Sequence, residues 1–152
     1  MANTQQFCTF FLHDQCFGVP VEQVQEVIRY QEMTRVPLGP DVVRGLINLR
    51  GQIVMAIDLR RRLGMQERSE SQLPMNVVVR TEDGAVSFLV DEIGDVIQVE
   101  RDTLEAPPET LRGPTRAMVV GVYKLPNQLL LELNIATAVA IDKAKDQSMA
   151  QA

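Results

Sequence analysis

The sequence predicts a mainly β protein made of small antiparallel barrels arranged as two similar lobes. Short apolar runs, rich in Val, Ile, Leu and Phe, are separated by turn residues throughout the chain. Only a few short segments have helical periodicity. In addition, one pattern of residue types occurs twice along the 152 residues. Many short strands with little helix are typical of small barrels, and the repeated pattern predicts two of them.

The repeat consists of two pairs of matching segments in the same order. Residues 17–28 match residues 86–97 in type, and residues 45–59 match residues 121–135. The second copy is longer, and its extra residues fit the Pro-rich connection around residues 106–109. Two copies of one unit indicate two lobes with a seam between them, which is a natural place for a partner to bind. The alternative is chance similarity among Val-rich β segments.

The chain opens with a predicted β-hairpin of residues 7–12 and 16–19 around a turn at residues 13–15. Pro20 then interrupts strand pairing. Between residues 21 and 28 the Val and Ile side chains recur at helical spacing, which predicts a short helix.

A second hairpin is predicted from apolar runs at residues 45–49 and 52–57, which flank a tight turn at Arg50 and Gly51. Asp58 is expected to cap a short helix through residue 63, and Gly64 to end it.

The second half repeats this order after a polar linker, residues 66–73. Its expected elements are strands 75–80 and 85–90 around a turn at 82–84, a Pro-rich loop at 104–115, a hairpin of 118–123 and 128–133, and an Asn134-capped helix at 135–141. The sequence therefore predicts lobes of residues 7–66 and 74–141, followed by a flexible tail, residues 142–152.

Composition and charge exclude several functional classes. The chain is 45% hydrophobic and 23% charged, as in ordinary globular proteins, and its net charge of −5 argues against a nucleic-acid partner. No run reaches the ~18 apolar residues that span a bilayer, so we expect no membrane insertion, and no signal peptide is recognisable. With no sign of export, Cys8 and Cys16 are expected to be reduced thiols in a cytoplasm.

The sequence contains few candidates for catalytic residues. His13 is the single histidine, it lies in a predicted turn, and no acid, base or nucleophile partner for it is evident. The cysteine spacing fits no metal site, and no Gly-rich phosphate-binding loop occurs. We therefore expect no enzymatic activity and no cofactor. The basic run at residues 60–62 is best interpreted as a solvated helix face.

Two features are candidates for partner binding. Arg50 lies at the tip of an apolar hairpin, where its guanidinium could donate to a partner or simply point into solvent. Val24 and Val27 fit either a core face or a partly exposed apolar strip, because charged residues, including Glu26, lie beside them.

Residues 43–60 closely resemble the signature of the CheW family of bacterial chemotaxis coupling proteins, and residues 17–28 resemble the segment that opens that domain. The resemblance extends over residues 7–141, which would form one CheW-like domain. It implies two five-stranded, SH3-like antiparallel β-barrel lobes with a few short helices. It also implies a non-catalytic adaptor rather than an enzyme.

The resemblance further implies partners and their contact residues. The adaptor would link methyl-accepting chemoreceptors to the regulatory domain of a CheA-type histidine kinase, in cytoplasmic arrays beneath the inner membrane. The receptor tip would dock between the lobes and contact Val24, Glu26, Val27 and Arg50. Ile53 and Val54 would contact the kinase. The alternative is a small β-barrel ligand-binding protein or enzyme that uses the seam.

Overall fold

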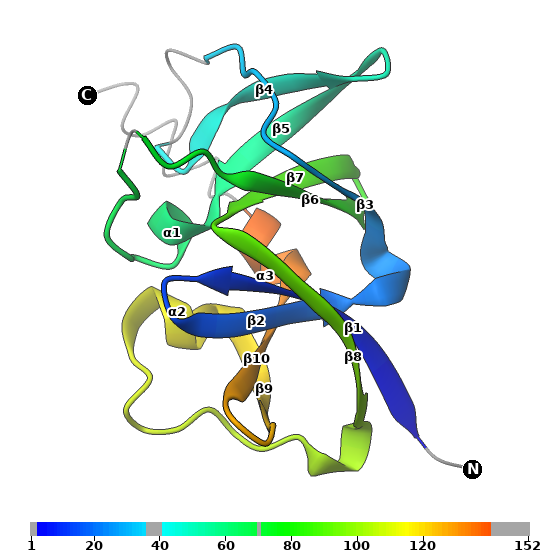
Figure 1. Ribbon diagram of the computed structural model, residues 1–152, viewed down its shortest axis with the longest axis vertical. Helices are drawn as coiled ribbons and strands as arrows, with labels where there is room; N and C mark the ends of the chain where they lie inside the picture. Colours follow the sequence, from blue (N-terminus) through cyan, green and yellow to red (C-terminus); the bar gives the residue numbers. More distant parts are fainter. Residues whose placement is uncertain (1–2, 36–40, 70, 141–152) are drawn as a thin grey trace.

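The computed structural model describes residues 3–35, 41–69 and 71–140 (Figure 1). In chain order the elements are β1 (Thr4–Leu12), β2 (Gln15–Pro20), a 3₁₀ turn (Val21–Gln23), β3 (Val24–Ile28), β4 (Val43–Leu49), β5 (Gln52–Asp58), α1 (Leu59–Arg62), β6 (Met75–Thr81), β7 (Gly84–Val90), β8 (Glu92–Glu100), a 3₁₀ turn (Arg101–Thr103), α2 (Gly113–Met118), β9 (Val119–Lys124), β10 (Leu129–Leu133) and α3 (Ile135–Val139). In the described part of the chain, every helix is too short to cross a membrane.

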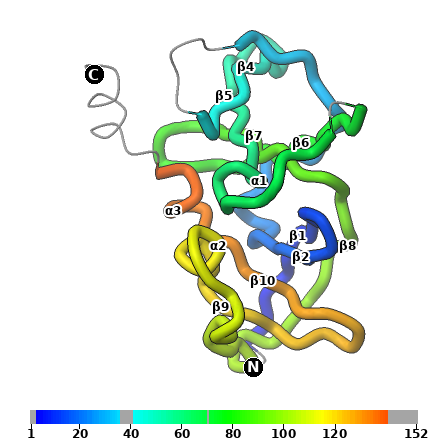
Figure 2. The backbone as a smooth tube through the Cα atoms, turned by 90° about the vertical axis from the view of Figure 1, so that its left-hand side faces the viewer, coloured from blue at the N-terminus to red at the C-terminus, as the bar shows by residue number. Residues whose placement is uncertain are grey.

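The strands form two five-stranded sheets, which confirms the mainly β fold class. Sheet A has the strand order β8-β1-β2-β10-β9, and sheet B has the order β3-β6-β7-β5-β4. The pairings are antiparallel except for β10 with β2 and β5 with β7, which run parallel. The two sheets lie one above the other, with α1 and α3 near the level of their boundary (Figures 1 and 2).

The two sheets do not correspond to the expected lobes, residues 7–66 and 74–141. The hairpin β1–β2 pairs with β8 and β10 from the second half, whereas the hairpin β6–β7 pairs with β3 and β5 from the first half. Each half therefore gives its hairpin to the other sheet. Because both halves encode the same unit, either hairpin has a suitable pattern for either sheet, and the sequence repeat does not specify which pairing forms.

The repeat itself has a structural counterpart at two glycines. A Cβ atom added to Gly45 would lie 2.6 Å from the backbone oxygen of Thr34, and one added to Gly121 would lie 2.6 Å from that of Glu105. At both places a short bridge covers the edge of the sheet, from Thr34 to the residue after Gly45 and from Glu105 to the residue after Gly121. A side chain at either glycine would block this close approach.

The predicted helix over residues 21–28 is wrong after its first turn. Residues Val21–Gln23 form a 3₁₀ turn, and β3 follows as an edge strand of sheet B. A bulge at Gln25 places Val24 opposite Val79 and Val27 opposite Val77. Both valines therefore lie on the same face of the sheet although they are three residues apart. The bulge produces the spacing that resembled a helix, since a regular strand would put them on opposite faces.

Several local predictions are confirmed. Turns connect the predicted hairpins, and the first is a two-residue turn at His13 and Asp14. Asp58 caps α1 by accepting a hydrogen bond from the Arg60 backbone N–H, 3.1 Å. Asn134 caps α3 in the same way, through the Thr137 N–H at 3.1 Å. The helix expected at residues 135–141 ends at Val139, and the predicted tail, residues 142–152, lies outside the described residues.

Three clusters of buried side chains hold the two sheets together. The largest, here called the shared core, lies between the sheets and includes Phe10 and Phe17 from sheet A and Ile57 and Phe88 from sheet B. Each sheet also has a core of its own. The core of sheet A contains Phe7, Cys16, Tyr123 and Leu130, and that of sheet B contains Ile47, Leu49, Val54 and Val78.

A buried ionic cluster joins the two sheets beside the shared core. Asp91, between β7 and β8, accepts hydrogen bonds from Arg60 Nε at 2.9 Å and from Arg68 Nη2 at 3.0 Å. It also accepts one from the His13 backbone N–H, 2.8 Å, in the β1–β2 turn. Arg68 also forms an ion pair with Asp58, with Nη1 at 3.3 Å from Oδ1. The side chains of Asp91, Arg60, Arg68 and Asp58 are each less than a tenth exposed.

The surroundings of Asp91 change its affinity for a proton. Burial alone would raise the pKa of this carboxyl, but hydrogen bonds from Arg60, from the His13 N–H and from Arg68 outweigh it and hold the pKa below its ordinary value of 3.8. A carboxyl whose pKa is lowered on folding stabilises the fold above its unfolded pKa. That stabilisation is lost as the pH falls through the folded pKa.

We expect Asp91→Asn to reduce the free energy of unfolding by roughly 3–5 kcal/mol near neutral pH, because two buried guanidinium groups lose their counter-charge. Urea unfolding at a series of pH values measures this. The gap between the variant and the wild type should be widest at pH 7 and should narrow below pH 3.8, as the wild-type carboxyl also takes up a proton. Asp95→Asn, at an exposed position on β8, is the matched control. An equal loss in both variants would contradict the role of the cluster.

Candidate partner-binding surface

Arg50 projects from the tip of the β4–β5 hairpin. Both turn residues have positive φ angles, 55° at Arg50 and 88° at Gly51, as two-residue hairpin turns require. The Gly51 N–H donates to Asn48 Oδ1 at 2.9 Å and so fixes the turn. The Arg50 side chain is 76% exposed. The position was predicted from sequence, and the structure adds the direction in which the side chain extends.

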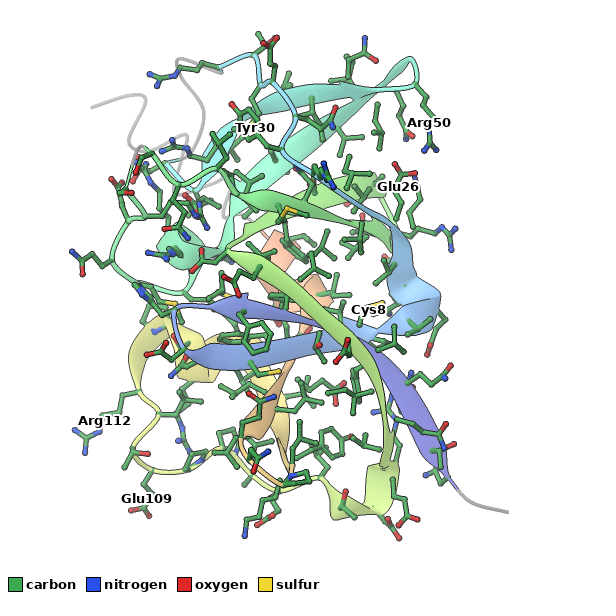
Figure 3. All side chains as sticks on the ribbon, in the orientation of Figure 1. Cys8, Glu26, Tyr30, Arg50, Glu109 and Arg112 are labelled. Carbon is green, nitrogen blue, oxygen red and sulfur yellow. The ribbon has the colours of Figure 1, made fainter. Side chains whose placement is uncertain are left out.

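The Arg50 guanidinium reaches across to β3 and forms an ion pair with Glu26, with Nη1 at 2.8 Å from Oε2 (Figure 3). The Glu26 side chain is only 15% exposed, and its second oxygen, Oε1, is buried and has no hydrogen-bond partner among the described residues. The pair thus joins two residues that are 24 positions apart in sequence.

Val24 and Val27 lie on the face of β3 that is directed toward the shared core, because their partners Val79 and Val77 belong to that core. Val24 packs against it as a partly buried residue. Val27, nearer the end of the strand, is 37% exposed. Each of the two interpretations therefore holds for one valine. Val24 is mostly a core residue, and Val27 is an exposed apolar residue at the seam.

Val96 on β8 is an exposed apolar residue that the sequence analysis did not select. It is 58% exposed and pairs with Cys8, which packs against the shared core, so Val96 also lies on the seam-facing side of its sheet. Strand β3 of sheet B and strand β8 of sheet A are equivalent edge strands, each paired with the first strand of a hairpin. The signal was available, because the internal repeat aligns Val27 with Val96. We call Val24, Val27 and Val96, with the Arg50–Glu26 pair, the seam surface.

The two residues assigned to a kinase contact differ in exposure. Ile53 on β5 is 62% exposed, whereas Val54 is completely buried in the core of sheet B. Successive residues of a strand point to opposite faces, so only one of the two side chains can reach a partner. The Val54 side chain packs in the core of sheet B, so of the two residues Ile53 is the one whose side chain is placed to meet a partner.

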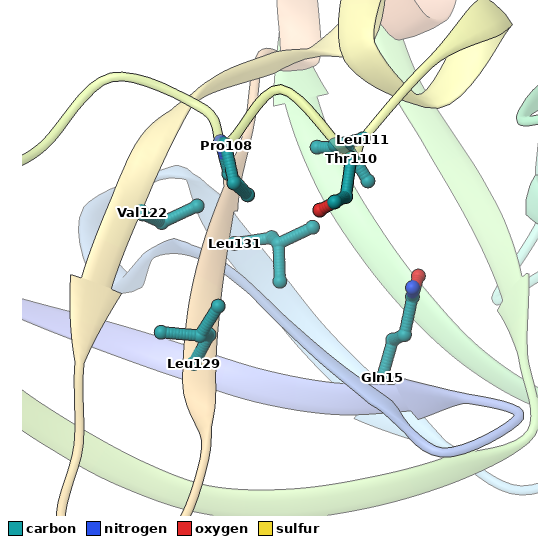
Figure 4. A pocket seen from close by; sticks show the side chains of 7 residues that line it. All are labelled: Gln15, Pro108, Thr110, Leu111, Val122, Leu129 and Leu131. Atoms are coloured by element: carbon teal, nitrogen blue, oxygen red, sulfur yellow. The ribbon is translucent and has the colours of Figure 1, made fainter.

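The described residues offer little for catalysis. Among them, no group of three or more His, Cys, Asp or Glu side chains is placed to hold a metal ion. Cys8 and Cys16 are free, and burial raises the pKa of the Cys16 thiol to about 11, which makes it a poor nucleophile. A small pocket of about 170 Å³ on sheet A is lined mainly by apolar side chains from β9, β10 and the loop before α2, with Gln15 at one side (Figure 4).

Comparison with known proteins gives a consistent result. The CheW-like domain model matches residues 6–142. A chemotaxis protein CheW from Bacillus subtilis is 32% identical over 145 residues, which cover 95% of this chain and 91% of the relative. One from Treponema pallidum is 28% identical over 139 residues, 88% and 82% of the two chains. The crystal structure of the scaffolding protein TtCheW from Thermoanaerobacter tengcongensis superposes with a TM-score of 0.82 at 25% identity, covering 93% of this chain and 95% of that one.

The exposure of Val27 leads to a prediction about stability. Val27→Asp should change the free energy of unfolding by no more than about 1 kcal/mol, because the new carboxylate stays in contact with water. Its cross-strand partner Val77 is 1% exposed, so Val77→Asp should unfold the protein or lower its melting temperature severely. Thermal melts of both variants measure the difference. A collapse of the Val27 variant would show that this position is core rather than surface.

Proposed function

The chain belongs to the CheW-like domain family and is a non-catalytic chemotaxis adaptor, and we propose that it couples the tip of a methyl-accepting chemoreceptor to the regulatory domain of a CheA-type histidine kinase. Its place of action would be the cytoplasmic receptor array beneath the inner membrane. In this proposal the receptor tip binds the seam surface, and the kinase domain binds the β4–β5 hairpin around Ile53. An enzyme or ligand binder acting at the seam is not favoured, because side chains of the shared core fill the space between the sheets.

The observation that supports the receptor contact best is the pair of exposed valines on equivalent edge strands. Val27 and Val96 expose apolar surface on the seam-facing sides of sheets B and A, beside an exposed arginine. An amphipathic helix presents apolar side chains along one face and polar ones at its margin. A helical receptor tip is therefore suited to bury both valines while its polar margin meets Arg50.

Arg50 would act as a donor that Glu26 holds in place. One nitrogen of the guanidinium is bound to Glu26, which leaves its other N–H groups for carboxylates or carbonyls of the receptor. An ion pair this exposed contributes little to stability, about 0–1 kcal/mol, so its value to the protein would lie in binding.

We expect Arg50→Ala to leave the fold intact but to disrupt receptor control of the kinase. The fold survives because the side chain is mostly solvent-exposed, so the cost is within about 1 kcal/mol. Arg50→Lys should restore control only in part, since a point charge cannot donate to Glu26 and to the receptor in the geometry of a planar fork. The measurement is receptor-stimulated kinase autophosphorylation in a reconstituted array.

The matched control is Arg112→Ala, which removes an exposed arginine from the loop that precedes α2 (Figure 3). It should behave as the wild type does. Full kinase activity with full receptor control in Arg50→Ala would refute the assignment of this residue.

The kinase contact makes a separate prediction. Ile53→Asp should weaken binding of the cognate kinase regulatory domain by about tenfold or more, the equivalent of about 1.4 kcal/mol, because it places a charge in an apolar contact. Isothermal titration calorimetry measures the affinity. Leu73→Asp, at another exposed apolar residue, is the control and should bind normally. If both variants bind the kinase domain as the wild type does, the kinase does not use this hairpin.

A further inference from the structure

A large polar cavity lies at the end of sheet B where β4 begins. Its volume is about 540 Å³, within the range of small-molecule sites, roughly 300–1,000 Å³. Its described walls come from residues 30–35, the start of β4, the end of β5, α1, residues 67–69 and 72–74, and β7. Tyr30, labelled in Figure 3, marks this region, which is separate from the Arg50–Glu26 pair.

The charge of the cavity is opposite to that of the chain. Four arginines line it, Arg35, Arg44, Arg61 and Arg68, against two carboxylates, Asp58 and Glu67. The chain as a whole carries a net charge of −5. Ion pairs neutralise Arg61 and Arg68, so any local positive potential that attracts anions comes from Arg35 and Arg44.

Two of these arginines are fixed in position by the protein. Arg61 pairs with Asp41 at 2.6 Å and with Glu67, and Arg68 is held by Asp58 and Asp91. Arg61 Nε is nevertheless buried and has no hydrogen-bond partner among the described residues. Because this atom is enclosed, the Arg61 side chain is fixed by the ion pairs of its terminal nitrogens with Asp41 and Glu67.

The other two arginines supply charge that the described residues do not neutralise. Arg35 and Arg44 are exposed and form no ion pair within residues 3–35, 41–69 and 71–140. They line the same cavity as the fixed pair, so a ligand there can meet guanidinium groups from several directions. A tetrahedral phosphate accepts hydrogen bonds from several directions at once, whereas a planar carboxylate is matched by one or two guanidinium forks.

We propose that this cavity binds a phosphorylated small molecule, with Arg35 and Arg44 as its principal charge contacts. The volume exceeds what a single phosphate group needs. The apolar side chain of Met33 and the ring of Tyr30 also line it and suit the organic part of such a ligand. This inference does not rest on the adaptor function.

The cavity is placed so that a ligand and the adaptor's partners can bind together. Arg44 lies near the start of β4 and Arg50 just beyond its end. At about 3.3 Å per residue, the strand separates them by about 20 Å. Occupancy of the cavity therefore leaves the seam surface free.

Calorimetric titrations with pyrophosphate, adenosine monophosphate, adenosine and citrate test the proposal on the intact chain. We expect one saturable site for a phosphate-bearing probe and none for adenosine. Tighter binding of adenosine monophosphate than of pyrophosphate would support an organic phosphate, and the reverse order would overturn the role assigned to the organic part. The double variant Arg35→Gln/Arg44→Gln should weaken that binding by about tenfold or more. Both side chains are exposed, so thermal melts should show that it folds.

The matched control is Arg80→Gln/Arg112→Gln, which removes the same charge from two exposed positions outside the cavity lining. It should bind the probes as the wild type does. An equal loss in both double variants would mean only general electrostatic attraction and would overturn the proposal. So would the absence of saturable binding of both phosphate probes, or citrate binding as tightly as they do.

Discussion

The architecture depends on one packing constraint, which is that the central strands of both sheets must be buried on both faces. In sheet A, Phe7 points into that sheet's own core and Phe10 into the shared core, and in sheet B Val78 and Val77 divide in the same way. One sheet alone cannot bury both apolar faces of such a strand, because the second face would remain in contact with water. The two sheets therefore form a single packed unit.

The same constraint decides where partners can bind. Central strands are enclosed, so exposed apolar side chains lie mainly on edge strands and hairpin tips, as at Val27, Val96 and Ile53. The buried cluster around Asp91 ties the β1–β2 turn to α1 and to the start of β8, so that loops from both sheets are fixed relative to one another. A body fixed in this way suits a scaffold, whose task is to hold two partners in a defined geometry.

Sequence reasoning succeeded where a structural signal is local. The turn at Arg50 and Gly51, the caps at Asp58 and Asn134, and the hairpin around His13 each follow from a few adjacent residues. It failed at residues 24–28, where a bulge at Gln25 imitates helical spacing, because side-chain periodicity alone does not distinguish the two. Among the proposed contact residues, Arg50, Glu26 and Val27 were chosen by motif, whereas Val96 was added only from its exposure in the structure, despite its place in the repeat.

The sequence by itself determined the fold class, the internal duplication, the family and the identity of the turn arginine, since each is encoded in contiguous motifs. Only the tertiary structure decided which hairpin completes which sheet, because both halves present compatible strands and long-range packing selects between them. It also decided that Val54 is buried while its neighbour Ile53 is exposed, and that Arg50 meets Glu26. These outcomes depend on which face of a strand meets another element, and that information is absent from any single segment of the chain.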